Sequence, residues 1–135
     1  MPRAPSLPAA RSRATGVRTP RQRAGAAAEE AAARHLQQHG LAVLERNLRF
    51  RGGELDLVCR DGGTLVFVEV RLRRDARYGG AAASVDVFKQ RRLVRAAQLF
   101  LLERYGSRPP ACRFDVVAFG ADGTIDWIRD AFAVD

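Results

Sequence analysis

Two carboxylates and one guanidinium each stand between two apolar residues in strand-like segments of this chain. Asp56 lies in the stretch Gly-Glu-Leu-Asp-Leu-Val at 53–58, and Glu69 and Arg71 lie in Val-Phe-Val-Glu-Val-Arg at 66–71. A buried carboxylate is costly unless it is paired or binds a metal ion. Two carboxylates beside a cation are a common way to hold Mg²⁺ together with a phosphate group.

The spacing places these three side chains on one face of a hairpin. Both segments are rich in β-branched and aromatic residues, and Asp-Gly-Gly at 61–63 predicts the turn between them. If the two glycines form the loop, Asp56 faces Glu69 directly, and Arg71 shares their face. A loop made of the aspartate and the first glycine leaves Asp56 diagonal to Glu69, whereas a three-residue loop flips the register. The alternative is an ordinary half-exposed hairpin whose charges face water.

Two further charged side chains are expected to face inward from helices. Residues 25–39 predict an alanine-rich helix in which Glu29 begins the inward stripe, although an acid in the first turn also favours the helix dipole. Residues 84–105 predict a longer helix, with Ser84 as its N-cap and a glycine after its last residue. Lys89 is the only lysine of the chain and falls on the apolar face of that helix. We expect it to reach a carboxylate or to extend out to water.

The remaining segments complete an α/β domain. Residues 41–50 predict a first strand, and residues 113–121 and 124–128 predict a second hairpin with Trp127 in the core. Residues 73–83 predict a basic loop with two glycines, which either contacts a nucleic-acid backbone or is a solvated connection. The order helix, three strands, helix, two strands indicates a mixed five-stranded sheet flanked by helices.

The positive charge is concentrated at the N-terminus. The chain has 135 residues and a formal charge of +8, of which the six arginines and no acids of residues 1–24 contribute +6. This tail has too little apolar surface to offset its ordering entropy, so we expect a disordered tail over 1–24 and one domain over 25–135. Three interpretations of this tail are open. It binds phosphates by counterion release, it is an organellar transit peptide, which it resembles, or it has no specific role.

Composition also limits the cellular setting. No apolar run of the sequence is long enough to span a membrane, so no membrane partner is expected. The two cysteines, Cys59 and Cys112, lie in strand-like segments without metal-ligand spacing. They predict reduced, buried thiols and a cytoplasmic protein.

Taken together, the motifs resemble the uncharacterised bacterial protein family that includes YraN. The resemblance covers residues 25–132 and rests on six motifs: Gly-x-x-x-Glu at 25–29, Gly-Glu-Leu-Asp-Leu at 53–57, Val-Phe-Val-Glu-Val-Arg at 66–71, Val-x-x-x-Lys at 85–89, Arg-Phe-Asp-Val-Val at 113–117 and Trp-Ile-x-x-Ala-Phe at 127–132. That family is similar to Holliday-junction resolvases and other nucleases of the restriction-endonuclease fold, the PD-(D/E)xK superfamily.

The resemblance implies a restriction-endonuclease-like core and a metal-dependent nuclease site. In that site Asp56 and Glu69 would be ligands of Mg²⁺ or Mn²⁺, with Glu29 as a third acid. The implied partner is DNA, with branched or structured DNA as a candidate substrate. Related resolvases act as dimers, so a homodimer is a candidate assembly.

One departure from the family pattern concerns the cation of the site. The usual Glu-x-Lys reads Glu69-Val70-Arg71 here. Arginine contacts phosphate well but stays protonated, so it cannot act as a general base. Lys89 is a candidate for the missing ammonium group. The first hypothesis is a Mg²⁺-dependent endonuclease. The second is a catalytically impaired nucleic-acid-binding module that retains the fold, and the third is a protein-interaction domain.

Overall fold

The computed structural model describes residues 17–72 and 85–133 and shows an α/β fold. Its elements are α1 (Pro20–Gln38), β1 (Ala42–Phe50), β2 (Gly53–Asp61), β3 (Thr64–Leu72), α2 (Val87–Tyr105), β4 (Cys112–Phe119) and β5 (Ile125–Ile128). The expected order of elements is confirmed, and the arrangement is consistent with a restriction-endonuclease-like core. The expected basic loop over 73–83, Ser84 and residues 1–16 of the expected tail lie outside the described residues.

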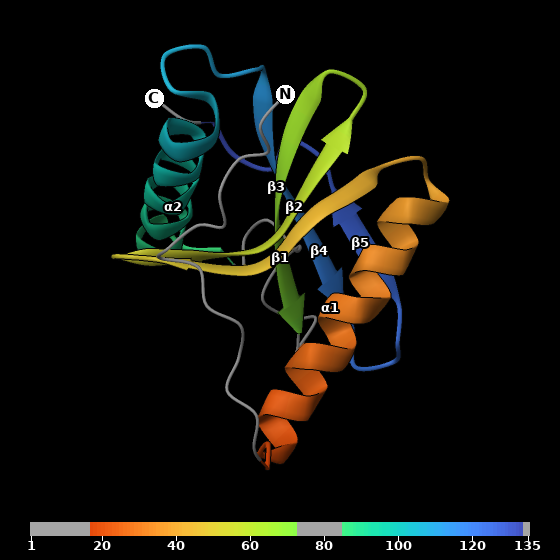
Figure 1. The fold of residues 1–135 in the computed structure, drawn as a ribbon. Coiled ribbons are helices and arrows are strands. Elements are labelled where there is room, and N and C mark those ends of the chain that lie inside the picture. The colour runs from red at the N-terminus through yellow and green to blue at the C-terminus, as the bar shows by residue number, and fades with distance from the viewer. Residues whose placement is uncertain (1–16, 73–84, 134–135) are drawn as a thin grey trace.

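One mixed sheet of five strands lies between the two helices (Figure 1). Its strand order is β1-β2-β3-β4-β5, with β3 and β4 parallel and the other neighbours antiparallel. The helix α2 belongs to the crossover that joins the two parallel strands, as parallel pairing requires. The described helices cover opposite faces of the sheet, so each face has its own apolar core.

The side chains of β3 alternate between these two cores. Phe67 packs on the α2 side, where its ring meets the rings of Phe100 and Phe114 at centroid distances of 5.9 and 5.4 Å. Val66 and Val68 pack on the α1 side. Full burial of one such apolar side chain contributes roughly 1.5–3 kcal/mol. Since odd-numbered residues of β3 face α2, Glu69 lies on the α2 face of the sheet.

The first helix begins earlier than the sequence pattern predicts. Thr19 is its N-cap, and the side chain and backbone of Thr19 exchange hydrogen bonds with those of Gln22 in a capping box. Pro20 occupies the first helical position, where its missing N–H costs nothing. The expected boundary between residues 24 and 25 is therefore five residues too late, and residues 20–24 are helical instead of disordered.

The second helix begins at a different cap from the expected Ser84. The carboxylate of Asp86 accepts a hydrogen bond from the Lys89 N–H over 2.8 Å, which makes Asp86 the N-cap. Val85, just before it, is buried in the core on the α2 side. The helix ends at Tyr105, before a glycine with φ of 60°, as expected.

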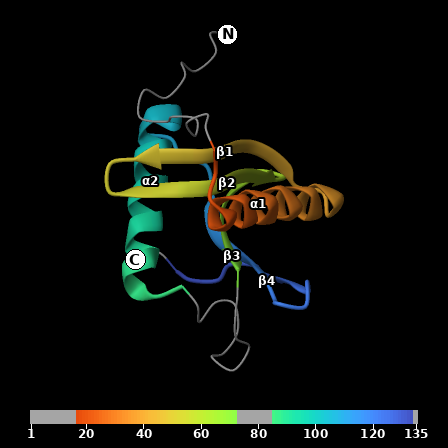
Figure 2. The same cartoon turned by 90° about the horizontal axis from the view of Figure 1, so that it is seen from below.

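The β2–β3 hairpin has the expected register but separates at Asp56. Its ladder runs from the pair Asp61–Thr64 to the pair Leu57–Val68, with the two glycines as the loop, and no pair is formed beyond Leu57. From there the β1–β2 hairpin continues toward α2 (Figure 2). Leu55 packs in the α2-side core and Leu57 in the α1-side core, although residues two apart in a flat strand share a face. The strand β2 therefore twists over at Asp56.

A glycine allows the start of β2 to lie directly against α2. A Cβ atom at Gly53 would be 2.2 Å from the carbonyl oxygen of Arg92 and 3.0 Å from its carbonyl carbon. A side chain there would push the helix away from the sheet. Gly53 thus fixes the close approach of β2 to the helix that carries Lys89.

The second hairpin is present, with shorter strands than expected. The strand β4 ends at Phe119, two residues before the expected end. Trp127 is half-buried and packs against the α1-side core, at its margin. Cys59 is buried as expected, whereas Cys112 is exposed at the start of β4, which corrects the expectation of two buried thiols. No helix in the described ranges has the length and apolar character needed to cross a membrane.

Candidate metal and phosphate site

Asp56 and Glu69 form a carboxyl pair where β2 leaves β3. Glu69 is only 3% exposed, and Asp56 is half-buried. The two carboxyl groups hydrogen-bond to each other, and the Val70 N–H donates to Asp56 Oδ2 over 2.9 Å. The Asp56 side chain thus takes up a backbone donor at the place where the β2–β3 ladder ends.

The environment of the pair favours the protonated form of both acids. Burial raises the pKa of Glu69 to about 8, and the negative charge of Asp56 adds to this effect. Burial also raises the pKa of Asp56, although the hydrogen bond from Val70 opposes the shift. Two carboxyl groups can hydrogen-bond to each other only through a shared proton. The raised pKa values of the pair thus favour a retained proton, which a bound cation would displace.

Two cations approach the same oxygen of Glu69. Lys89 Nζ lies 3.3 Å from Glu69 Oε2, and Arg71 Nη1 lies 3.7 Å from it. Both cationic side chains remain about one third exposed, whereas the Glu69 side chain is 4% exposed. The two cations thus connect the buried acid to the surface, where an anionic group of a ligand can reach them.

The acid pair fits the coordination chemistry of Mg²⁺. This ion is usually held by one or two carboxylates, with water and substrate phosphate oxygens as its other ligands. Asp56 and Glu69 supply two such carboxylates on adjacent strands. A divalent cation between them would also offset the burial that raises the pKa of both acids and the charge of Asp56 that adds to the shift of Glu69.

The third expected acid is not gathered into the same group. Glu29 is half-buried on α1, the helix that packs on the opposite face of the sheet from α2. Within residues 17–72 and 85–133, no group of three or more His, Cys, Asp or Glu side chains is placed to hold a metal ion. The structure thus brings together Asp56, Glu69, Arg71 and Lys89. The role of Glu29 as a third metal ligand stays a prediction.

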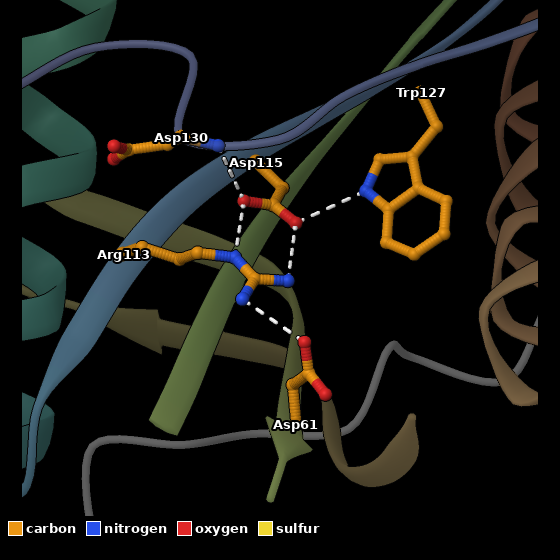
Figure 3. Close-up of polar contacts among 5 residues, drawn as sticks. All are labelled: Asp61, Arg113, Asp115, Trp127 and Asp130. Atoms are coloured by element: carbon orange, nitrogen blue, oxygen red, sulfur yellow. Dashed lines mark hydrogen bonds and ion pairs between the residues drawn. The ribbon is translucent and has the colours of Figure 1, made fainter. Parts of the chain in front are cut away.

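A second buried carboxylate, that of Asp115, was not singled out by sequence reasoning as a site residue. Asp115 is fully buried and accepts four hydrogen bonds: from Arg113 Nε (3.0 Å) and Nη2 (3.3 Å), from Trp127 Nε1 (3.0 Å) and from the Asp130 N–H (2.9 Å) (Figure 3). Arg113 Nη1 also donates to Asp61 Oδ2 over 3.0 Å. With its charge balanced and its oxygens satisfied, Asp115 joins β4 to β5 and to the segment after β5, and Arg113 extends the network to the end of β2. A lone acid in the apolar run of β4 is the sequence signal for it.

Comparison with known proteins places the chain in a family. The family described as "Uncharacterised protein family UPF0102" matches residues 28–119. A UPF0102 protein of Xanthomonas campestris pv. campestris (strain B100) is 59% identical over 116 residues, which cover 85% of this chain and 95% of the relative. A UPF0102 protein of Janthinobacterium sp. (strain Marseille) is 54% identical over 114 residues, covering 84% and 90%.

The matched region contains the candidate site. Residues 28–119 include both acids of the pair, both cations and the strand β4. The resemblance to the YraN family predicted from the motifs is confirmed at this level of similarity. On the extent of the family match and the identity to these relatives, the chain belongs to the UPF0102 family.

Proposed function

We propose that this protein is a Mg²⁺-dependent endonuclease that hydrolyses phosphodiester bonds in DNA. The observation that carries the proposal is the convergence of two carboxyl groups and two cations at one point of the sheet. Asp56 and Glu69 are in contact there, and Lys89 Nζ lies 3.3 Å from Glu69 Oε2. Acids for a divalent cation beside cations for a phosphate are the components that phosphodiester hydrolysis needs.

Each side chain has a distinct role in this proposal. Asp56 and Glu69 would hold the Mg²⁺ ion. When bound, such an ion lowers the pKa of a water molecule and neutralises the charge that develops on the phosphate. Arg71 stays protonated and would hold a phosphate oxygen through its N–H groups. Lys89 would supply the ammonium group that the family pattern places two residues after the glutamate, at position 71.

Cleavage assays with a matched pair of variants test the proposal. Wild-type protein is incubated with a four-way DNA junction and with linear duplex, in Mg²⁺, in Mn²⁺ and in EDTA. We expect metal-dependent cleavage that Glu69→Gln abolishes, because the variant keeps the shape of the side chain but loses its charge. Glu103→Gln, on an exposed acid of the same helix as Lys89, is the control and should cleave normally. Cleavage that persists in Glu69→Gln, or no cleavage under any condition, would refute the proposal.

A nucleic-acid-binding module without catalysis is the second candidate. It is favoured by one observation, the arginine at position 71 where the family pattern has lysine. On this alternative, wild-type protein binds DNA with a steep salt dependence but does not cleave it. Removal of residues 1–16 weakens this binding. Arg71→Lys separates the two candidates. If it creates metal-dependent cleavage in a chain that otherwise only binds, the native site is impaired.

A further inference from the structure

Phe88 exposes an aromatic ring beside the candidate site. Its side chain is 74% exposed in the first turn of α2, whereas Phe67, Phe100 and Phe114 are buried. Phe88 directly precedes Lys89, whose ammonium group reaches Glu69. Consecutive helix residues point about 100° apart, so the ring faces solvent while the lysine faces the acid pair.

The ring belongs to a positively charged strip along α2. The guanidinium carbon of Arg91 lies 6.0 Å from the centre of the Phe88 ring, and Arg91, Arg92 and Arg95 are all exposed. These residues follow Phe88 at three, four and seven positions, which places them on one side of the helix. Between Asp86 and Glu103 the helix contains no acid. Phe88 and the three arginines are called the α2 strip below.

The strip continues onto the end of the β1–β2 hairpin. Arg95 Nε donates to the Arg51 carbonyl oxygen over 3.3 Å, and Arg51 itself is exposed. Cationic side chains thus extend from the acid pair along the helix and onto the hairpin. This is a surface that complements a polyanion and not an apolar partner.

An exposed aromatic ring among arginines is suited to one feature of nucleic acids. Bases stack on aromatic side chains, and guanidinium groups contact the flanking phosphates. In an intact duplex every base is already stacked between its neighbours, so a ring on the protein surface gains this contact only with an unpaired or extruded base. Duplex DNA alone would use the arginines and leave Phe88 without a partner.

We infer that Phe88 is a stacking platform for an unpaired base and that Arg91 holds an adjacent phosphate. Because the platform is next to Lys89, the substrate has a single-stranded segment or a branch point close to the bond that is cleaved. This inference rests on the proposed function for its position beside a cleavage site. The binding of DNA to the α2 strip is measured without cleavage and is independent of it.

The test compares single-stranded and duplex DNA in EDTA. An oligonucleotide with a central 2-aminopurine is titrated with the full-length protein, alone and annealed to its complement, and both affinity and base fluorescence are recorded. We expect Phe88→Ala to weaken single-strand binding by roughly 5- to 100-fold, as loss of one base–aromatic stack does, and to leave duplex binding unchanged. The fluorescence change seen with wild-type protein should disappear in Phe88→Ala and return in Phe88→Trp.

A matched variant controls for loss of apolar surface. Leu102 is 65% exposed on the same helix but lies near its other end. Leu102→Ala should bind both DNAs as wild type does. Equal single-strand affinity of Phe88→Ala and wild type would overturn the inference. So would a lower melting temperature of Phe88→Ala with unchanged binding, because the ring would then pack on its own chain. A dimer that Phe88→Ala dissociates would overturn it by placing a second copy on the ring.

The two proposals fail in distinguishable ways. If wild-type protein never cleaves DNA but Phe88→Ala loses single-strand binding, the nuclease proposal fails and the stacking platform stands. If wild-type protein cleaves DNA and Phe88→Ala binds and cleaves all substrates normally, the platform fails and the nuclease proposal stands.

Discussion

The sheet contains two groups of buried carboxylates that are neutralised in opposite ways. Asp115 accepts four hydrogen bonds, two of them from the guanidinium of Arg113. Glu69 instead contacts another acid, and its two cationic neighbours, Lys89 and Arg71, lie at 3.3 and 3.7 Å from one oxygen and reach the surface. The difference lies in how many donors the fold itself supplies to each acid.

This contrast separates a structural acid from a site for a ligand. A buried charge with all its donors in place stabilises one arrangement of the chain. In the pair of Asp56 and Glu69, burial raises the pKa of both acids, so the fold only partly compensates their negative charge. A divalent cation can complete this compensation. We therefore expect Asp115 to govern stability, and Asp56 and Glu69 to govern ligand binding.

The largest expected effect is the difference in stability between two acid-to-amide variants, one at Asp115 and one at Asp56. Asp115→Asn places an NH₂ group or a weaker acceptor against four donors and should lower the free energy of unfolding by about 3–5 kcal/mol. Asp56→Asn keeps an acceptor for the Val70 N–H and removes a repulsive charge, so it should change stability by less than about 1 kcal/mol. Urea denaturation without metal measures both. Similar losses in the two variants would contradict the contrast.

The next effect is a pH dependence confined to the acid pair. The pKa of Glu69 is raised from its ordinary value of 4.5 to about 8, so the folded state binds a proton more tightly than the unfolded chain. The associated stability is complete below pH 4.5 and is lost as the pH rises through about 8. Glu69→Gln should therefore gain stability over wild type across this range, by on the order of a few kcal/mol.

Thermal unfolding of both proteins at several pH values in EDTA measures that difference. Mg²⁺ or Mn²⁺ should stabilise wild type more at pH 8 than at pH 6, because binding must displace the shared proton. A stability difference between the two proteins that does not change with pH would contradict the assignment.

A smaller effect is expected from the glycine that brings α2 against β2. Gly53→Ala forces a Cβ atom against the Arg92 carbonyl oxygen, and the resulting overpacking should cost about 1–3 kcal/mol. The displaced helix carries Lys89, so affinity for Mn²⁺ should change as well. Gly63→Ala is the matched control, since nothing lies within 4 Å of a Cβ there. Calorimetric titration with Mn²⁺ and urea denaturation measure the two effects, and equal behaviour of the two variants would contradict this prediction.

The smallest effect concerns how much stability is lost when one of the four hydrogen-bond donors to Asp115 is removed. Trp127→Phe removes one of four donors and keeps most of the ring, so it should cost about 1–2 kcal/mol. Metal binding at the acid pair should not change. Urea denaturation measures the loss, and a cost as large as that of Asp115→Asn would show that the indole carries most of the interaction.

Much of the acid pair could be predicted because it depends on local sequence. Two glycines set the loop of the β2–β3 hairpin, the loop sets the register, and the register places Asp56 close to Glu69. The inward position of Lys89 followed from helical periodicity in the same way. The start of α1 was equally local, and the capping box at Thr19 and Gln22 was the signal that would have placed it correctly.

Other features depend on contacts between distant segments and left little trace in any one window. The Asp115 network joins Asp61, 54 residues before it in the chain, to Trp127 and Asp130 after it. The twist of β2 at Asp56 accompanies the close approach of Gly53 to α2, and only the packed structure reveals both. The exposed position of Phe88 likewise follows from where the helix meets the sheet.

The irregularities of β1 also protect the molecule at the margin of its sheet. β1 forms one edge of the sheet, and a long regular edge invites pairing with a strand of another molecule. Its register shifts between Val43 and Glu45, and Asn47 has a φ of 52° in mid-strand. Charged side chains flank these points, with Arg46 paired to Glu30 of α1. The distortions beside the candidate site thus also act against aggregation, because they leave no flat run of free backbone groups for another strand.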